Sequence, residues 1–195
     1  MHECIGIVLK KISHHKIALL DKDRGRLDAI IVKPIGVGTL IIYNIDRQRD
    51  TLIYVNQWRM ENLPLNLARH DILFLHHIFE LCYYFVPLGS FTEKLFELCM
   101  FLYTVDTDIE LTQQMKKIYL FKILKAIGVY PRLLQLPQPI LHELEKPLTA
   151  WNSAQIAFAY EKKLDEWLRI CIGDHPAIAK FKTMHYLVSQ VGCYE

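Results

Sequence analysis

Residues 114–127 of the chain read QMKKIYLFKILKAI and are followed closely by Gly128 and Pro131. At about 100° per residue, a helix over this stretch has an apolar main face. Its opposite face carries lysines, but also Ile118 and Phe121. A helix on the surface would show a single apolar stripe. The pattern therefore predicts a helix in the middle of a bundle that ends at a left-handed glycine, with Pro131 beyond it.

The sequence that surrounds this stretch predicts further helices. From about residue 63 onward, apolar residues recur every three or four positions. This period predicts helices at 66–86, 91–104, 112–127, 153–171 and 176–190, with Ser90, Thr112 and Ser153 as N-caps. The proline-rich segment 131–147 is expected to hold at most one short helix.

The first sixty residues differ, because short runs of β-branched and aliphatic residues alternate there with turns. The runs are CIGIVLKK, KIALLDK, RLDAIIV, TLIIYNI and TLIYVNQW. Five short strands joined by tight turns indicate a small barrel, either an OB-fold or an SH3-like barrel, since counting strands does not separate the two. We therefore expect an α+β protein, with a five-stranded barrel at 1–62 and an α-helical domain at 63–195.

The composition is that of an ordinary folded protein, with 52% hydrophobic and 23% charged residues. Five cysteines stand far apart, without the close spacing of a metal site, which favours reduced thiols in a cytosolic protein. The N-terminal residues lead into a strand pattern rather than a signal peptide. The most apolar stretch, 72–88, is interrupted by polar residues and Pro87. These observations predict a soluble, cytoplasmic protein with no membrane partner.

The excess of positive charge lies in the first third of the chain. Residues 1–60 contain ten Lys or Arg and six Asp or Glu. Most of these basic residues fall in or beside turns of the expected barrel: Lys10, Lys11, Lys16, Lys22, Arg24, Arg26, Arg47 and Arg49. They are either ordinary solubilising charge or a strip that follows a sugar–phosphate backbone without reading bases. Tyr43, Tyr54 and Trp58 either stack on bases or belong to the barrel core.

Three stretches of the chain together resemble the RecO family of bacterial recombination mediators. The opening GIVLKK…KIALLDKDRGRLDAII resembles the family's first three strands. FKILKAIGVYP resembles its central helix and exit turn, and FKTMHYL lies where relatives show a lysine and an apolar pair. The resemblance implies an N-terminal OB-like barrel followed by helices.

The same resemblance implies a function without chemistry. The protein would bind single-stranded DNA and its coating protein, promote annealing, and load the recombinase indirectly together with a RecR-like partner. Two departures weaken this assignment. The loop 133–147 lacks the zinc-binding cysteines of many relatives, and the turn 34–39 lacks their arginine-rich insert. The alternative is a protein-interaction module that keeps the fold but has little affinity for DNA.

No motif in the sequence predicts an enzyme, a cofactor or a metal site. Walker-type, GxSxG and HExxH patterns are missing. His142 and Glu143 alone cannot complete a tetrahedral zinc site. DTDIE at 106–110 lacks the glycine and the later glutamate of a calcium loop. The pairs His14–His15 and His76–His77 are better explained as surface or core residues.

The back face of the central helix is a candidate binding site for a partner's tail. Lysines frame one aromatic residue there, and the face comprises Lys117, Ile118, Phe121, Lys122 and Lys125. These lysines would hold the acidic residues of the coating protein's tail, and Phe121 and Ile118 would contact its apolar end. The alternative is that Phe121 packs under a neighbouring helix while the lysines extend to water.

Overall fold

The computed structural model describes residues 3–104, 111–129, 131, 135–147 and 158–183. The contacts divide the chain into two compact units, Met1–Asp108 and Ile109–Glu195. Strands end at Asn62 and helices begin at Leu65, so the type of secondary structure changes well before the first unit ends. The first unit therefore contains two helices in addition to its strands.

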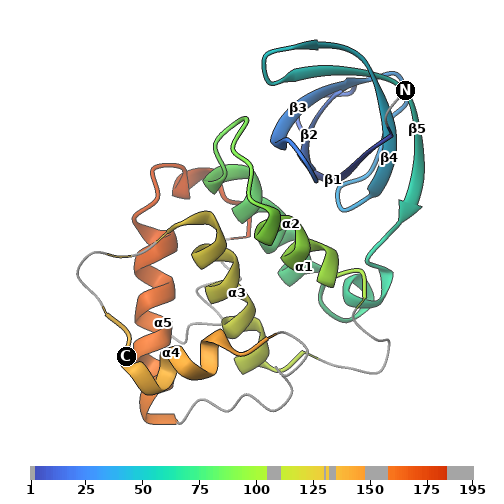
Figure 1. The fold of residues 1–195 in the computed structure, drawn as a ribbon. Coiled ribbons are helices and arrows are strands. Elements are labelled where there is room, and N and C mark those ends of the chain that lie inside the picture. The colour runs from blue at the N-terminus through green and yellow to red at the C-terminus, as the bar shows by residue number, and fades with distance from the viewer. Residues whose placement is uncertain (1–2, 105–110, 130, 132–134, 148–157, 184–195) are drawn as a thin grey trace. The chain divides into compact units, whose positions relative to one another are not determined.

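The first unit contains a closed five-stranded barrel, as the sequence predicts (Figure 1). Its strands are β1 (Cys4–Lys11), β2 (Lys16–Asp21), β3 (Gly25–Ile31), β4 (Leu40–Arg49) and β5 (Leu52–Asn62). They follow each other around the barrel in the order β1-β2-β3-β5-β4, with β3 parallel to β5 and every other neighbouring pair antiparallel. This order makes the barrel OB-like.

Alternation along the strands fills the barrel. Val8, Ile17 and Leu19 belong to a buried cluster that continues through β3, β4 and β5. Ile7 and Ala18 point the other way, out of the barrel, yet they are also buried. One outer face of β1 and β2 is therefore covered by other parts of the unit.

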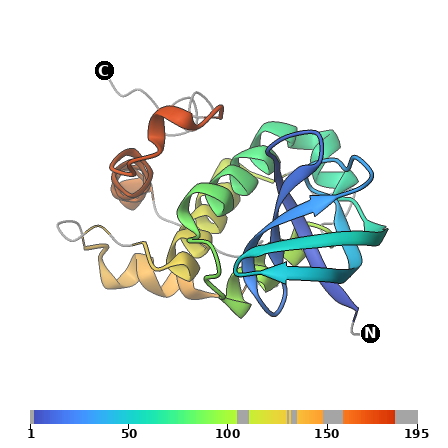
Figure 2. The same ribbon diagram turned by 90° about the horizontal axis from the view of Figure 1, so that it is seen from above.

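Two helices follow the barrel, α1 (Leu65–Phe85) and α2 (Glu93–Phe101), and α1 packs against β1 (Figures 1 and 2). Asp71 interrupts α1 with non-helical backbone angles, and its Oδ1 accepts a hydrogen bond from Phe74 N at 2.8 Å. Gly25 marks the close approach of the β2–β3 turn to the segment between the helices. It has φ +74°, and a Cβ there would lie 1.9 Å from the Ser90 carbonyl oxygen.

The second unit contains α3 (Gln113–Ile127), α4 (Gln138–Glu145), α5 (Phe158–Gly173) and a short 3₁₀ helix, Ile178–Lys180. α3 is the helix predicted from residues 114–127, and it packs against α4 and α5. Both of its predicted ends are confirmed. Thr112 Oγ1 accepts a hydrogen bond from Met115 N, and Gly128 is left-handed at φ 83°.

Two predicted helix boundaries are wrong, and one lies outside the described residues. Ser90 does not cap α2, whose N-cap is Thr92; the Ser90 carbonyl instead accepts a hydrogen bond from Arg26 N at 3.3 Å. The described start of the expected helix 176–190 forms only the 3₁₀ turn. Residues 184–190 and the expected cap Ser153 lie outside the described residues.

Candidate nucleic-acid interface

The eight predicted DNA-binding residues do not form one strip. β2 separates Lys16, at its first residue, from the β2–β3 turn that follows Asp21. Five residues of strand span about 16 Å. Lys22, Arg24 and Arg26 therefore lie at the opposite end of β2 from Lys16.

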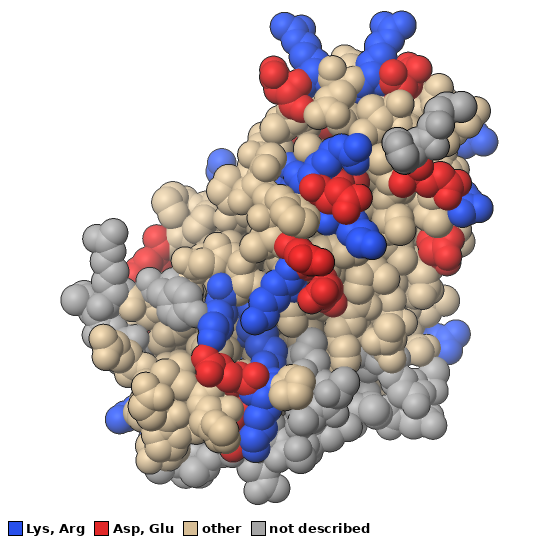
Figure 3. All heavy atoms as spheres, viewed as in Figure 1, with Lys and Arg blue, Asp and Glu red and all other residues tan. Residues whose placement is uncertain are grey.

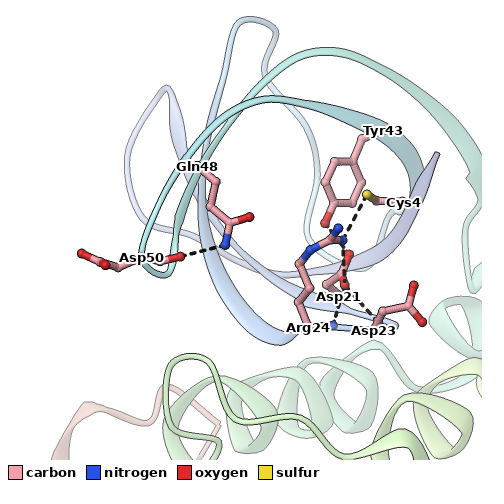
Figure 4. Close-up of polar contacts among 7 residues, drawn as sticks. All are labelled: Cys4, Asp21, Asp23, Arg24, Tyr43, Gln48 and Asp50. Carbon is pink, nitrogen blue, oxygen red and sulfur yellow. Dashed lines mark hydrogen bonds and ion pairs between the residues drawn. The ribbon is translucent and has the colours of Figure 1, made fainter. Parts of the chain in front are cut away.

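Arg24 is held inside a polar network at the β2–β3 turn (Figure 4). The buried Asp21 accepts hydrogen bonds from the backbone N–H groups of Asp23 and Arg24, and from the Tyr43 hydroxyl at 2.5 Å. Arg24 Nη1 lies 3.6 Å from Asp21 Oδ1 and donates to Cys4 Sγ. Burial, followed by the charge of Asp21, raises the pKa of Tyr43, so its hydroxyl remains a donor. This arrangement stabilises the turn and engages the Arg24 guanidinium with Asp21 and Cys4, so it is less available to a phosphate.

Lys10 and Arg26 are directed toward α1 and not toward open solvent. Lys10 Nζ lies 4.4 Å from the ring centroids of both Tyr83 and Tyr84 and donates to the Tyr84 hydroxyl. Arg26 stacks over Tyr83 at 4.4 Å and donates to the Val86 carbonyl. Cation–π contacts and hydrogen bonds of this kind fix the barrel to its helix, so both side chains have a structural role.

Apart from Lys22 in the β2–β3 turn, the remaining predicted residues lie at the β1–β2 turn and the β4–β5 hairpin. We call Lys11, Lys16, Arg47 and Arg49 the basic edge. Lys16 lies 2.7 Å from Asp28, and Arg47, with 83% of its side chain exposed, lies 3.8 Å from Asp46. Lys11 and Arg49 are exposed and have no ion pair with any residue that the structure describes.

Figure 3 shows acidic and basic side chains interspersed over the barrel, with basic side chains projecting from the end that carries the β4–β5 hairpin. On the face that this view shows, positive charge is therefore not continuous. Turns β1–β2 and β4–β5 are the ones around which OB-folds bind oligonucleotides. An edge of this size can contact a few phosphates, as weak binding without base selection requires.

The three aromatic candidates have different environments. Tyr43 is buried inside the barrel, and Trp58 is partly buried against the same core cluster. Tyr54 points outward from β5 and is 38% exposed. The sequence alone does not decide between core and binding face for these three residues. Alternation along a strand shows which side chains share a face, but not which face points into the barrel.

A shallow, open depression of about 210 Å³ lies elsewhere on the barrel. Its lining includes Trp58, Asn44 and Arg59, and Arg59 lies 3.6 Å from Glu3 across it. Pockets for drug-sized ligands begin at about 300 Å³. The depression has space for no more than a small group.

The face of α3 predicted to bind a partner's tail is covered by neighbouring helices of its own unit. Ile118 and Phe121 are each 1% exposed, and the Phe121 ring lies 5.0 Å from that of Trp167 on α5. Lys117 is also buried, with its Nζ 2.8 Å from both Glu161 Oε1 and Asp165 Oδ1. These three side chains are therefore not open to a partner's apolar side chain in this structure.

The other two lysines of this face interact with α4. Lys122 Nζ donates to the carbonyls of Leu144 and Lys146 at the end of that helix, and Lys125 pairs with Glu145. Phe121 packs against a neighbouring helix, as the packing alternative predicts, but the three lysines interact with α4 and α5 and do not simply extend to water. A tail site here stays a prediction without a structural argument. Glu161 and Asp165 were not among the predicted site residues. The available signal was two acids four residues apart on one helix, each followed three positions later by a leucine that is buried in the structure.

Within the described part of the chain, no three His, Cys, Asp or Glu side chains gather closely enough to hold a metal ion. The cysteines described there, Cys4, Cys82, Cys99 and Cys171, are buried and form no disulfide with one another. Among the described helices, none combines the length and apolar character needed to cross a membrane. The loop 133–147, in which no zinc site is expected, lies partly outside the described residues.

Comparisons with known proteins add no further assignment. Neither a scan against models of protein families nor a search of curated proteins found a match to this chain.

Proposed function

We propose that this protein is a non-catalytic recombination mediator of the RecO type that binds single-stranded DNA through the basic edge of its barrel. It would also bind the DNA-coating protein, promote annealing and help a RecR-like partner to load the recombinase. The observation that carries the DNA-binding part is the position of Lys11, Lys16, Arg47 and Arg49 around the two turns that OB-folds use for oligonucleotides. The resemblance in sequence supports the remaining steps.

The alternative is a protein-interaction module with the same fold and little affinity for DNA. A specific observation favours it, because Lys10, Arg24 and Arg26 are engaged within the protein, and Lys16 is paired with Asp28. The charge left for a polyanion is smaller than the sequence suggests. The two functions therefore differ in whether an exposed edge of few cations binds DNA measurably.

A titration of the full chain with a single-stranded oligonucleotide at several salt concentrations separates them. Each phosphate contact contributes about 0.7 to the slope of log affinity against log salt on single strands. Replacing Arg47 and Arg49 with Gln should therefore lower the slope by about 1.4. The matched control replaces Lys22 and Arg59, which are exposed on the barrel away from the edge, with Gln.

The control variant should keep the wild-type slope while carrying the same net charge as the edge variant. Equal slopes in both variants would overturn the assignment of the site to the basic edge. Absence of binding by the wild type at low salt would reject DNA binding and favour the interaction module. Repeating the titration with the coating protein present tests the mediator role, which requires a complex of all three components.

A further inference from the structure

Tyr54 occupies a special position on the outside of the barrel. It is the aromatic residue among the three candidates that faces outward, while Tyr43 and Trp58 contribute to the interior. Tyrosine gains stability when its ring is covered, yet Tyr54 remains 38% exposed in the unit that the structure describes. Its exposure places a flat apolar surface beside the β4–β5 hairpin.

The strand register assigns Tyr54 to a row of four residues that crosses four strands. Ile30 on β3 is the partner of Tyr54, and Lys16 on β2 is the partner of Ile30. On the other side, Arg47 on β4 is the partner of Tyr54. Residues paired across strands present their side chains on the same face, so all four lie on the outside of the barrel.

The row places two apolar side chains between two cations. Neighbouring strands are about 4.8 Å apart. Arg47 therefore lies about 5 Å from Tyr54 and Lys16 about 10 Å from it, measured across the sheet. The half-buried Ile30 fills the place between Tyr54 and Lys16. An apolar ring and an aliphatic neighbour are thus framed by cations on both sides, and no carboxylate belongs to the row.

Resting on the DNA-binding function proposed above, we infer that Tyr54 is a base-stacking platform of the basic edge. A base of the single strand lies on the Tyr54 ring beside Ile30, and the cations Arg47 and Lys16 contact phosphates on either side of it. Every base has a π-face, so this contact raises affinity without selecting a sequence. Asp28 holds Lys16 in position at 2.7 Å, whereas the Arg47 side chain is 83% exposed and lies at the longer distance of 3.8 Å from Asp46.

Tyr54→Ala separates stacking from charge. It should weaken binding of a single-stranded DNA oligomer by about 5- to 150-fold, which is the measured range for loss of one stacked base. The slope against salt should not change, since no phosphate contact is removed. Tyr54→Phe should bind as the wild type does. The matched control is Met60→Ala, because Met60 is 57% exposed on the same strand outside the row.

An oligomer with abasic sites provides a second, independent readout. The wild type should lose affinity on the abasic strand by about the same factor as Tyr54→Ala loses on the normal strand. Tyr54→Ala should lose little further affinity when the normal strand is replaced by the abasic strand. Melting temperatures of the variants should match the wild type, because an exposed side chain contributes little to stability.

The outcomes distinguish this inference from the function on which it depends. If Arg47 and Arg49 control the salt slope but Tyr54→Ala binds like the wild type, the stacking role is overturned and DNA binding stands. If the Tyr54→Ala and Met60→Ala variants lose affinity equally, the ring is likewise not the platform. If the wild type binds no DNA at low salt, both proposals fail together.

Discussion

Replacing Lys117 with Met should strongly destabilise the second unit. The Lys117 ammonium bridges α3 to α5, with Nζ 2.8 Å from carboxylate oxygens of both Glu161 and Asp165. Only 7% of the Lys117 side chain and 4% of the Asp165 side chain are exposed. Burial lowers the pKa of Lys117, but hydrogen bonds to Asp165 and Glu161 outweigh it and raise the pKa above its ordinary value. The charged form is therefore the stable one.

The magnitude follows from what the substitution leaves behind. Methionine retains most of the apolar volume of lysine, so little cavity is created. Two carboxylates, however, would face each other without a cation. Removing one partner of a buried ion pair costs about 3–5 kcal/mol. Lys125→Met is the matched control, since Lys125 and Glu145 are 33% and 54% exposed and such a surface pair contributes about 0–1 kcal/mol.

Denaturant unfolding of the full chain measures the difference, and hydrogen exchange of α3 and α5 assigns it to the second unit. Local exchange is needed because a chain of two units need not unfold in one step. Lys117→Met should accelerate exchange in both helices, whereas Lys125→Met should not. Adding Glu161→Gln and Asp165→Asn to Lys117→Met should recover much of the loss, since a neutral site no longer contains unpaired charge.

Equal stability of the Lys117→Met and Lys125→Met variants would refute this reasoning. It would mean that Lys117 is solvated in solution, as the tail-binding hypothesis requires. If Glu161→Gln and Asp165→Asn did not relieve the loss of stability, the proposed role of unpaired charge would be refuted. The cause would then be packing rather than charge.

Two further predictions concern the first unit, and each has a matched control. Burial lowers the pKa of His77 to about 4, below its ordinary 6.5, so the unfolded chain binds the proton more tightly. The contribution of neutral His77 to the free energy of unfolding is fully present above about pH 6.5. It decreases as the pH falls toward 4, and about 2 kcal/mol is lost at pH 5. Unfolding at pH 7 and pH 5 should show this loss in the wild type and in His76→Gln, which changes an exposed neighbour. It should not appear in His77→Gln. If His77→Gln still loses stability at pH 5, another titrating group causes the loss. Gly25→Ala should lower the melting temperature more than Gly128→Ala, because both have positive φ but only Gly25 lacks space for a Cβ; equal shifts would show that the β2–β3 turn moves away from Ser90.

The barrel could be predicted because its signals are local. Each strand is a short run of aliphatic residues, and each joint contains a residue suited to a turn, such as Gly25. The caps of α3 were equally local, since Thr112 and Gly128 act on backbone groups within a few residues. The N-cap of α2 is Thr92 and not Ser90, whose carbonyl accepts a hydrogen bond from the distant strand residue Arg26. Local sequence predicts that a helix begins near a given residue. Which residue caps it also depends on contacts with parts of the chain that are distant in sequence.

The candidate site was harder to predict, because the availability of a cation depends on residues far away in the sequence. Arg24 and Arg26 are neighbours of the same turn glycine, yet one enters a network with Asp21 and the other reaches Tyr83 on α1. Lys117 appears exposed on a helical wheel, although its partners follow 44 and 48 residues later. The hydrophobic period of a segment specifies its faces but not which face another element covers.

The packing of the barrel also determines how its proposed activity has to be studied. Ile7, Ala18 and Leu20 point out of the barrel and are at most 1% exposed, which requires cover from α1 and its surroundings. A fragment ending at residue 62 would expose this apolar face and would leave Lys10 and Arg26 without their tyrosine partners. Those two cations would then be available to DNA, and the fragment would bind for a reason that the intact protein lacks. Binding by the basic edge therefore has to be measured on a chain that keeps both helices, where Lys10 and Arg26 remain engaged.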